Sequence, residues 1–214
     1  MAQLDSTGLV YLVTQENLSA GRSTLDIVDA AIDGGVDIIQ LREKDRPASE
    51  RYAMGMAMRE RTAAAEVMFI VNDRVDLAKA VNADGVHLGQ SDLPIGVARD
   101  QLGSTAIIGQ SVSTPEEAIT AVEDGADYLG VGSIYQTSSK DTEPEKTAIG
   151  LDRLSAIRAV VDCPLIGIGG ITASNAQAVM DAGATGVAVI SEITAANDPV
   201  HATKQLSSAV KNGE

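Results

Sequence analysis

The sequence predicts an α/β protein that folds as a single parallel (β/α)8 barrel, a TIM barrel, over residues 1–214. Three observations carry this prediction. Eight short runs rich in Val, Ile and Leu alternate with helical patterns along the chain. These runs are continuously apolar, as is usual for strands buried on both faces. No linker, low-complexity segment or charge block divides the chain. The main alternative fold is an open doubly wound sheet.

The apolar runs and the helical patterns give the expected elements in chain order. The expected strands are residues 8–14, 36–42, 67–71, 84–89, 105–110, 127–131, 164–168 and 185–190. Amphipathic or Ala-rich stretches between them predict helices, for example residues 24–33, 49–65, 114–124, 151–161 and 172–182. Ser113 or Thr114 and Thr172 are available as helix N-caps.

One helix-to-strand join is repeated along the chain. The segments AAIDGGVDIIQ, AVEDGADYLGV and VMDAGATGVAV begin at residues 30, 121 and 179. In these three copies Gly34, Gly125 and Gly183 are placed to take the left-handed conformation that ends a helix at little cost. AVNADGVHLGQ, which begins at residue 80, is a looser fourth copy. The repeat supports regular alternation of helix and strand.

Polar side chains gather after the expected strands, where a barrel of this kind carries its active site. The opposite joins contain mostly Gly, Asp and Ala. The polar residues after strands two to six are Arg42, Glu43 and Lys44, then Asn72, Asp73 and Arg74, then Gln90 and Asp92, then Ser111, and then Thr137, Ser139 and Lys140. The sequence therefore places one functional site at the carboxyl ends of the strands.

Two carboxylates, Asp73 and Asp92, follow neighbouring strands and could share one Mg²⁺ ion. Adjacent strands lie about 5 Å apart in a sheet. Mg²⁺ is typically bound by one or two carboxylates together with waters and substrate phosphates. A zinc site is disfavoured because the chain has only two His and one Cys. Either Asp taken alone would also suit a helix N-cap.

Three basic residues, Arg42, Lys44 and Lys140, lie at the expected strand ends of a chain whose formal net charge is −14. Arg can bind two phosphate oxygens at once, and Lys adds a compact mobile charge. Together with Mg²⁺ these side chains suit a diphosphate. The hydroxyl groups of Ser111, Thr137 and Ser139 add hydrogen-bond donors.

A second phosphate site is predicted after strands seven and eight. Gly169 and Gly170 would let backbone N–H groups approach an anion closely. A helix expected to begin near Thr172 would direct its positive end to the same place, and Ser191 follows strand eight. Barrels frequently bind phosphate between these two loops. We therefore expect two substrates, one with a diphosphate and one with a monophosphate.

Composition disfavours other classes of protein. A pI near 4.4 argues against a nucleic-acid surface, which needs clustered positive charge. No stretch approaches the roughly 18 consecutive apolar residues of a membrane span, and the start MAQLDSTG lacks the features of a signal peptide. We expect a cytoplasmic protein that binds neither nucleic acid nor membrane. Homo-oligomer formation is left open, and the acidic excess suggests adaptation to high salt as a hypothesis.

A histidine and a cysteine, residue types that are often catalytic, are interpreted here as structural residues. His87 lies within an expected strand and is interpreted as a packed or barrel-lining imidazole rather than a general base. Cys163 has apolar neighbours and is interpreted as a buried structural thiol.

At these residues the chain resembles the thiamine-phosphate synthase family. The matching segments follow the family order over most of the chain. They are YLVT at 11–14, QLREK at 40–44, NDR at 72–74, ADGVHLGQSD at 83–92, GQSVS at 109–113, GSIYQTSSK at 132–140, IGGI at 168–171 and VISEI at 189–193. QLREK, NDR and DGVHLGQSD form a highly specific combination. The family fold is a (β/α)8 barrel, in agreement with the prediction above.

The resemblance implies a transferase that condenses 4-amino-2-methyl-5-(diphosphooxymethyl)pyrimidine with a thiazole phosphate, giving thiamine phosphate and diphosphate. It implies that Asp73 and Asp92 hold Mg²⁺. The residues implied for the pyrimidine diphosphate are Gln40, Leu41, Arg42, Glu43, Lys44, Asn72, Ser111 and Lys140, of which Arg42, Lys44, Ser111 and Lys140 are the catalytic set. Those implied for the thiazole phosphate are Thr137, Ser138, Ser139, Gly170, Ile190 and Ser191. Where the family has Thr-x-Thr-Lys, Ser139 keeps the hydroxyl and lacks a methyl group.

Other functions stay open on the same fold. A thiazole tautomerase would act on a single thiazole phosphate and would not need the metal and diphosphate residues. A non-catalytic phosphate-binding protein could keep similar loops without turnover. A barrel that isomerises or cyclises sugar phosphates is disfavoured because the sequence shows no evident acid–base pair.

Overall fold

The chain forms a closed barrel of eight parallel strands in sequential order, seen in a computed structural model that describes residues 4, 6–137 and 148–211. The strands are β1 (Leu9–Val13), β2 (Ile38–Leu41), β3 (Met68–Asn72), β4 (Gly85–Leu88), β5 (Ile107–Val112), β6 (Tyr128–Gly132), β7 (Leu165–Ile168) and β8 (Gly186–Val189). Strand β8 pairs with β1 and closes the barrel, with Val10 opposite Val187. The expected (β/α)8 fold is confirmed, and every strand ends within two residues of its expected limits.

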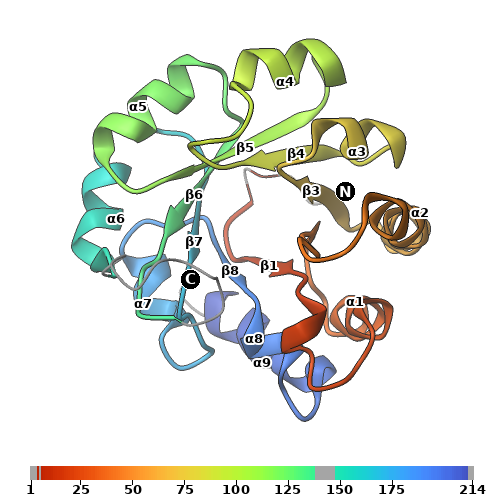
Figure 1. Ribbon diagram of the computed structural model, residues 1–214. Coiled ribbons are helices and arrows are strands. Elements are labelled where there is room, and N and C mark those ends of the chain that lie inside the picture. The colour runs from red at the N-terminus through yellow and green to blue at the C-terminus, as the bar shows by residue number, and fades with distance from the viewer. Residues whose placement is uncertain (1–3, 5, 138–147, 212–214) are drawn as a thin grey trace.

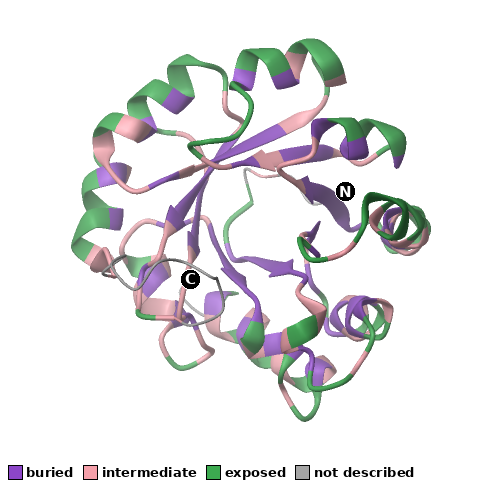
Figure 2. Cartoon of the chain, in the orientation of Figure 1, coloured by how far each residue is buried: buried purple, intermediate pink, exposed green. Residues whose placement is uncertain are grey.

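Helices surround the barrel as an outer ring (Figure 1). They are α1 (Thr24–Asp33), α2 (Ala48–Ala64), α3 (Val75–Ala80), α4 (Ile95–Leu102), α5 (Pro115–Glu123), α6 (Gly150–Arg158), α7 (Ala176–Asp181), α8 (Ser191–Thr194) and α9 (Pro199–Lys211), with a 3₁₀ helix η1 (Glu16–Leu18) after β1. Figure 2 shows that these helices bury the side that faces the strands and expose the other. Among the described residues, no helix is long and apolar enough to cross a membrane.

The beginnings of two helices test the expected N-caps. Thr114 caps α5, because its side chain accepts a hydrogen bond of 3.2 Å from the backbone N–H of Glu117. The expected start near Thr172 is wrong, since α7 begins at Ala176. The Asn175 side chain accepts from the N–H of Thr172 and donates to the carbonyl of Gly170. These local bonds hold residues 170–175 as a turn in place of a helix.

The repeated joins contain left-handed glycines at the expected helix ends, with one correction. Gly125 and Gly183 have φ values of 94° and 103°, as expected. In the first join Gly35 takes this conformation, with φ of 86°, whereas Gly34 stays right-handed at −81°. A Cβ on Gly34 would lie 2.4 Å from Cβ of Thr203 in α9. Gly34 is therefore required for the close approach of α9, and Gly35 for the turn.

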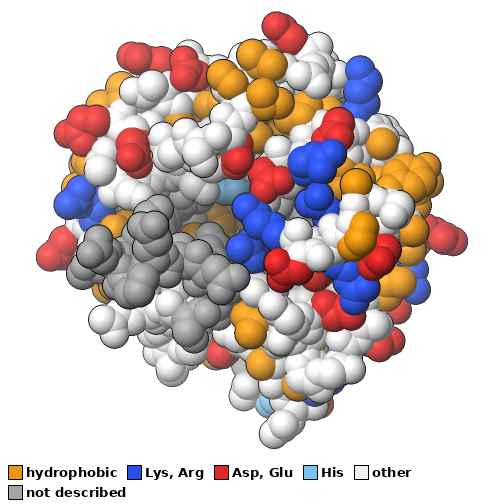
Figure 3. Space-filling model, in the orientation of Figure 1, with side chains coloured by type: hydrophobic (Ala, Val, Ile, Leu, Met, Phe, Trp, Pro, Cys, Tyr) orange, Lys and Arg blue, Asp and Glu red, His pale blue; other side chains and the backbone are white. Residues whose placement is uncertain are grey.

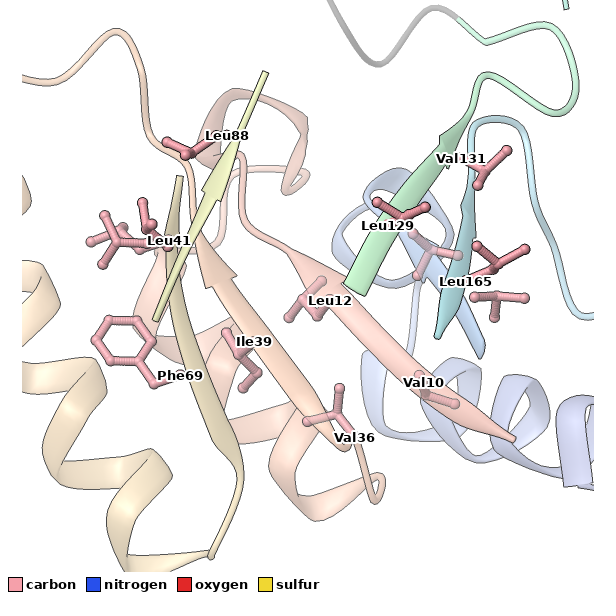
Figure 4. Close-up of a cluster of buried hydrophobic side chains, with 14 of the residues drawn as sticks. Val10, Leu12, Val36, Ile39, Leu41, Phe69, Leu88, Leu129, Val131 and Leu165 are labelled. Carbon is pink, nitrogen blue, oxygen red and sulfur yellow. The ribbon is translucent and has the colours of Figure 1, made fainter. Parts of the chain in front are cut away.

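The core has two layers, because alternate strand residues point to opposite faces of the barrel wall. Val10 and Leu12 of β1 belong to the larger layer between strands and helices, whereas Leu9, Tyr11 and Val13 belong to the layer inside the barrel. Figure 4 shows part of the larger layer, which includes Val10, Leu12, Leu41 and Phe69. Burying a side chain of this size contributes about 1.5–3 kcal/mol.

Polar residues continue the inner layer toward the carboxyl ends of the strands. On β2 and β3, Ile38 and Ile70 are inner-layer residues, so the same alternation directs Gln40 and Asn72 to the interior. The barrel interior therefore changes from apolar to polar where the strands end, and the candidate site begins there.

Candidate active site

A cavity of about 600 Å³, here called the barrel mouth, opens at the carboxyl ends of the strands. Residues from all eight strands or the loops after them line it. The predicted site residues among them are Gln40, Arg42, Lys44, Asn72, Asp92 and Ser111. Figure 3 shows the hollow, with Lys and Arg side chains gathered along one side and Asp and Glu side chains beside them. The barrel thus brings together residues that are up to about 70 positions apart in the sequence.

Arg42 and Lys44 bring positive charge to the mouth from the loop after β2. The Arg42 guanidinium donates to Oε1 of Gln15 at 2.7 Å, and its backbone N–H donates to Oγ1 of Thr14 at 3.2 Å. Lys44 Nζ lies 2.9 Å from Oδ2 of Asp73, and about half of the Lys44 side chain is exposed. Because exposed ion pairs contribute only about 0–1 kcal/mol, an anionic ligand can compete for Lys44.

Leu41 and Glu43 alternate with these residues and point away from the mouth. Leu41 belongs to the core between strands and helices. Glu43 is only 5% exposed, and its carboxylate accepts hydrogen bonds from the N–H of Glu16 and from the hydroxyl of Thr24. Their side chains anchor the loop that carries Arg42 and Lys44. Any contact from Leu41 or Glu43 to a ligand in the mouth would come from the backbone.

Asp73 and Asp92 line one depression beside the mouth, and Asp92 also lines the mouth itself. Neither residue caps the helix that follows, because Arg74 and Pro94 occupy those positions. Asp73 has a left-handed backbone, with φ of 53°, and its N–H donates to the carbonyl of His87 at 2.8 Å. A non-glycine residue in this conformation costs about 1–3 kcal/mol, and such residues cluster at functional sites.

The two carboxylates fit the ligand chemistry of Mg²⁺. Hard oxygen ligands on a shared, solvent-accessible depression leave room for waters and phosphate oxygens to complete the coordination. One oxygen of Asp92 already accepts from the N–H of Gly89 at 2.6 Å, which fixes its orientation. Within the described part of the chain, no three His, Cys, Asp or Glu residues form a metal-binding group. A cation here would therefore depend on the substrate for further ligands.

Hydrogen bonds between side chains run through the barrel interior beneath the mouth. We call this series the polar chain, and its members are Gln40, Tyr11, Tyr128, His87 and Ser111. Burial raises the pKa of both tyrosines, so their hydroxyl groups stay protonated at neutral pH. The expectation that His87 lines the barrel agrees with its place on the mouth.

A small cavity of about 40 Å³ adjoins the mouth after β7 and β8. Thr137, Gly170, Ile190 and Ser191, the described residues implied for the thiazole phosphate, all line it. Gly170 has φ of 62°, and a Cβ there would lie 2.5 Å from the carbonyl oxygen of Gln136. Only glycine fits this approach. Because α7 begins at Ala176, which does not line this cavity, the helix N-terminus predicted near Thr172 is not found here.

Three predicted site residues, Ser138, Ser139 and Lys140, lie outside the described residues. Sequence reasoning also missed several residues that the fold brings to the site. Tyr11 and Tyr128 could have been found from the two-residue period of the strands, since both belong to the inner layer. Gln15, which holds Arg42, carries no comparable signal in the sequence.

Comparisons with known proteins agree over nearly the whole chain. Residues 10–193 match the family model described as "Thiamine monophosphate synthase". The chain is 61% identical over 202 residues to a thiamine-phosphate synthase of Natronomonas pharaonis, covering 94% of each. It is 51% identical over 201 residues to a thiamine-phosphate synthase of Moorella thermoacetica, covering 94% of this chain and 95% of that protein.

Solved structures show the same similarity. A thiamine phosphate pyrophosphorylase from Pyrococcus furiosus superposes with a TM-score of 0.87 at 40% identity, covering 95% of this chain and 96% of that one. A 3-hexulose-6-phosphate synthase superposes with a TM-score of 0.72 at 18% identity, covering 94% and 99%. The second likeness shows the barrel fold alone.

Proposed function

The chain belongs to the thiamine monophosphate synthase family and is a transferase, and from this premise we propose that it joins the pyrimidine diphosphate to a thiazole phosphate, releasing diphosphate. One observation in particular supports these substrates. The mouth, which Arg42, Lys44 and Asp92 line, adjoins the small cavity that Gly170 and Ser191 line. The two spaces share three lining residues, Ser133, Ile168 and Ala188. Two phosphate-bearing ligands could therefore lie next to each other in one continuous space.

The reaction needs few catalytic groups from the protein. The bond between the pyrimidine methylene carbon and the diphosphate oxygen breaks, and its electron pair leaves with the diphosphate. The amino-substituted ring stabilises the methylene cation, and the thiazole nitrogen donates its lone pair to form the new C–N bond. No proton is lost in these steps, so no general base is required. The protein must hold the partners together and stabilise the leaving group.

The residues of the mouth suit this task. Arg42 is held in place by Gln15, and Lys44 can exchange the Asp73 carboxylate for diphosphate oxygens. The mouth volume of about 600 Å³ lies in the usual range for small-molecule sites. We assign Asp73 and Asp92 to Mg²⁺, which when bound would neutralise charge on the diphosphate. Lys140 is proposed to add a further positive charge, as the family resemblance implies.

Cys163 does not supply a competing covalent route. Burial raises the pKa of its thiol to about 11, so that it is not a thiolate at neutral pH. The thiol lies 3.9 Å from the carbonyl of Ala126, in the join before β6, at the end of the barrel opposite the mouth.

The test is diphosphate release by the purified protein with Mg²⁺ and both substrates, omitting each component in turn. We expect release to require both substrates and Mg²⁺, with thiamine phosphate formed in equal amount. Release without the thiazole phosphate would indicate hydrolysis in place of transfer. No release from protein shown to be folded by circular dichroism would contradict the proposal.

A further inference from the structure

The polar chain joins five side chains, each from a different strand, by four consecutive hydrogen bonds. Their distances are 2.6 Å from Gln40 Nε2 to the Tyr11 hydroxyl, 3.0 Å from there to the Tyr128 hydroxyl, 2.9 Å to His87 Nδ1, and 2.8 Å from His87 Nε2 to Ser111 Oγ. All five residues also line the mouth. The polar chain therefore connects two sides of the mouth through the barrel interior.

The direction of these hydrogen bonds follows from the Gln40 end. An amide nitrogen only donates, so the Tyr11 hydroxyl accepts from Gln40. Either hydroxyl could be the donor in the bond between Tyr11 and Tyr128, and we infer that Tyr11 donates because Tyr128 is the other described partner of its hydroxyl. Tyr128 in turn has its own hydrogen to donate to Nδ1 of His87. A neutral imidazole that accepts at Nδ1 carries its hydrogen on Nε2, so His87 donates to Oγ of Ser111.

Close packing holds the two rings in this arrangement. A Cβ on Gly109 would lie 2.1 Å from Cζ of Tyr128, and a Cβ on Gly130 would lie 2.8 Å from Cε1 of His87. The ring centroids of His87 and Tyr128 are 5.5 Å apart. Glycines on β5 and β6 thus provide the space that the rings fill. These contacts with strand residues build the orientation of His87 into the barrel wall.

We propose that His87 is a positioning residue that acts through Ser111. By donating to one lone pair of Ser111 Oγ, His87 leaves the Ser111 hydroxyl hydrogen to be donated into the mouth. This inference rests on the proposed function, because the acceptor is an atom of the pyrimidine diphosphate. In this arrangement Tyr11 accepts from Gln40 and donates to Tyr128, and Tyr128 donates to His87.

Two substitutions of His87 separate its two hydrogen bonds. The His87→Gln side chain places an amide nitrogen near the position of Nε2 and can still donate to Ser111. The His87→Asn side chain is shorter, reaches only the region of Nδ1 and loses that bond. Since the hydrogen bond to Ser111 is lost in His87→Asn and kept in His87→Gln, we expect His87→Asn to lower kcat by up to about tenfold and His87→Gln to retain most of it. Equal losses in both variants, at equal thermal stability, would overturn the inference.

A double-mutant cycle tests whether His87 acts through Ser111. If it does, His87→Asn should cost little in kcat once Ser111→Ala is present, because the group that His87 orients is gone. The single and double variants are compared by steady-state diphosphate release, with thermal unfolding measured for each. Losses that simply add would show that His87 acts independently of Ser111 and would overturn the inference.

Nuclear magnetic resonance of ¹⁵N-histidine-labelled, ligand-free protein tests the direction of the polar chain without turnover. The chain has only two histidines, so His87→Asn assigns the signals. We expect the His87 proton on Nε2, and a partial shift toward Nδ1 in Tyr128→Phe. A proton on Nδ1 in the unsubstituted protein would overturn the inference even if the enzyme is active. If His87 shows the expected tautomer but the protein releases no diphosphate, the direction of the polar chain is supported and the proposed function is contradicted.

Discussion

At the scale of single residues, two neighbouring basic side chains are held at the mouth in different ways. The Arg42 guanidinium donates to the Gln15 side chain, and the Arg42 backbone N–H donates to Thr14. Lys44, whose side chain is about half exposed, is paired with the carboxylate of Asp73, whose side chain is 18% exposed. The Gln15 contact orients the Arg42 guanidinium at the mouth, whereas Lys44 has to exchange the Asp73 carboxylate for an anion.

Arg42 and Arg46 form a matched pair for testing the diphosphate contact. Arg46 belongs to the same loop but bonds to Glu16 and Glu50 and does not line the mouth. We expect Arg42→Met to lower kcat/KM by about 10²–10³, as when one preorganised donor to a developing negative charge is lost. Arg46→Met should change kcat/KM by much less. Comparable losses in diphosphate release would argue against a specific role for Arg42.

Asp73 and Asp76 form a second matched pair, because both line the depression beside the mouth. Asp73→Asn removes a proposed Mg²⁺ ligand, and Asn tolerates the left-handed backbone at this position. We expect the Mg²⁺ concentration for half-maximal rate to rise at least tenfold, while the free energy of unfolding changes by less than about 1 kcal/mol.

Asp76→Asn serves as the control for this pair. Hydrogen bonds from Arg74 hold the pKa of the Asp76 carboxyl below its usual range, and Asp76 already has this partner. Its substitution should leave the Mg²⁺ dependence unchanged. A magnesium titration of the two variants that gives overlapping curves would remove Asp73 from the proposed metal site.

At the scale of elements, the mouth depends on how loops and strands are fastened to their neighbours. The buried Glu43 carboxylate joins the loop after β2 to the start of η1 and to α1. Arg22, just before α1, donates to the carbonyls of Thr194 and Ala196 after β8. These contacts hold the loops of β1, β2 and β8 together around one side of the opening.

Glycine within a strand has a specific structural role in this barrel. Gly109→Ala would place a Cβ against the buried ring of Tyr128, and the overpacking should cost about 1–3 kcal/mol or more in the free energy of unfolding. Gly96→Ala in α4 meets no heavy atom within 4 Å and should stabilise by about 0.4–1 kcal/mol. Urea unfolding of both variants checks this contrast. A neutral Gly109→Ala would mean that the β5–β6 wall relaxes easily.

At the scale of the whole molecule, the formal net charge of −14 opposes the compact state by self-repulsion. Raising KCl from about 0.1 to 1 M shortens the screening length from about 10 to 3 Å. We therefore expect Tm to rise over this range, and NaCl at equal ionic strength to have the same effect. A flat Tm series would count against the hypothesis of adaptation to high salt.

The closed barrel also supports the proposal that the chain is one domain. Its first and last strands pair directly, so no part of the sheet can separate without breaking strand contacts. We expect a single unfolding transition in urea, with coincident curves from circular dichroism and tyrosine fluorescence. The chain has no Trp, and the buried Tyr11 and Tyr128 report on the interior. Two separated transitions would contradict the single-domain proposal.

Local patterns predicted the positions of the eight strands and of five helices, whereas α3, α4, α8 and α9 were not given ranges and some helix ends were missed. The strands were predictable because each is a short apolar run, such as LVYLV at Leu9–Val13. The start of α7 and the choice between Gly34 and Gly35 were not, since each depends on a contact made in the folded chain. Asn175 holds the turn before α7, and Thr203 of α9 packs against Gly34.

The sequence by itself determined the barrel and the end of it that carries the polar residues, because both follow from periodicity and the order of elements along the chain. Only the tertiary structure decided that Glu43 is buried while Lys44 reaches Asp73, and that His87 links Tyr128 to Ser111. The physical reason is that these contacts join strands distant in the sequence. Their partners are set by strand register and barrel closure, which no local pattern encodes.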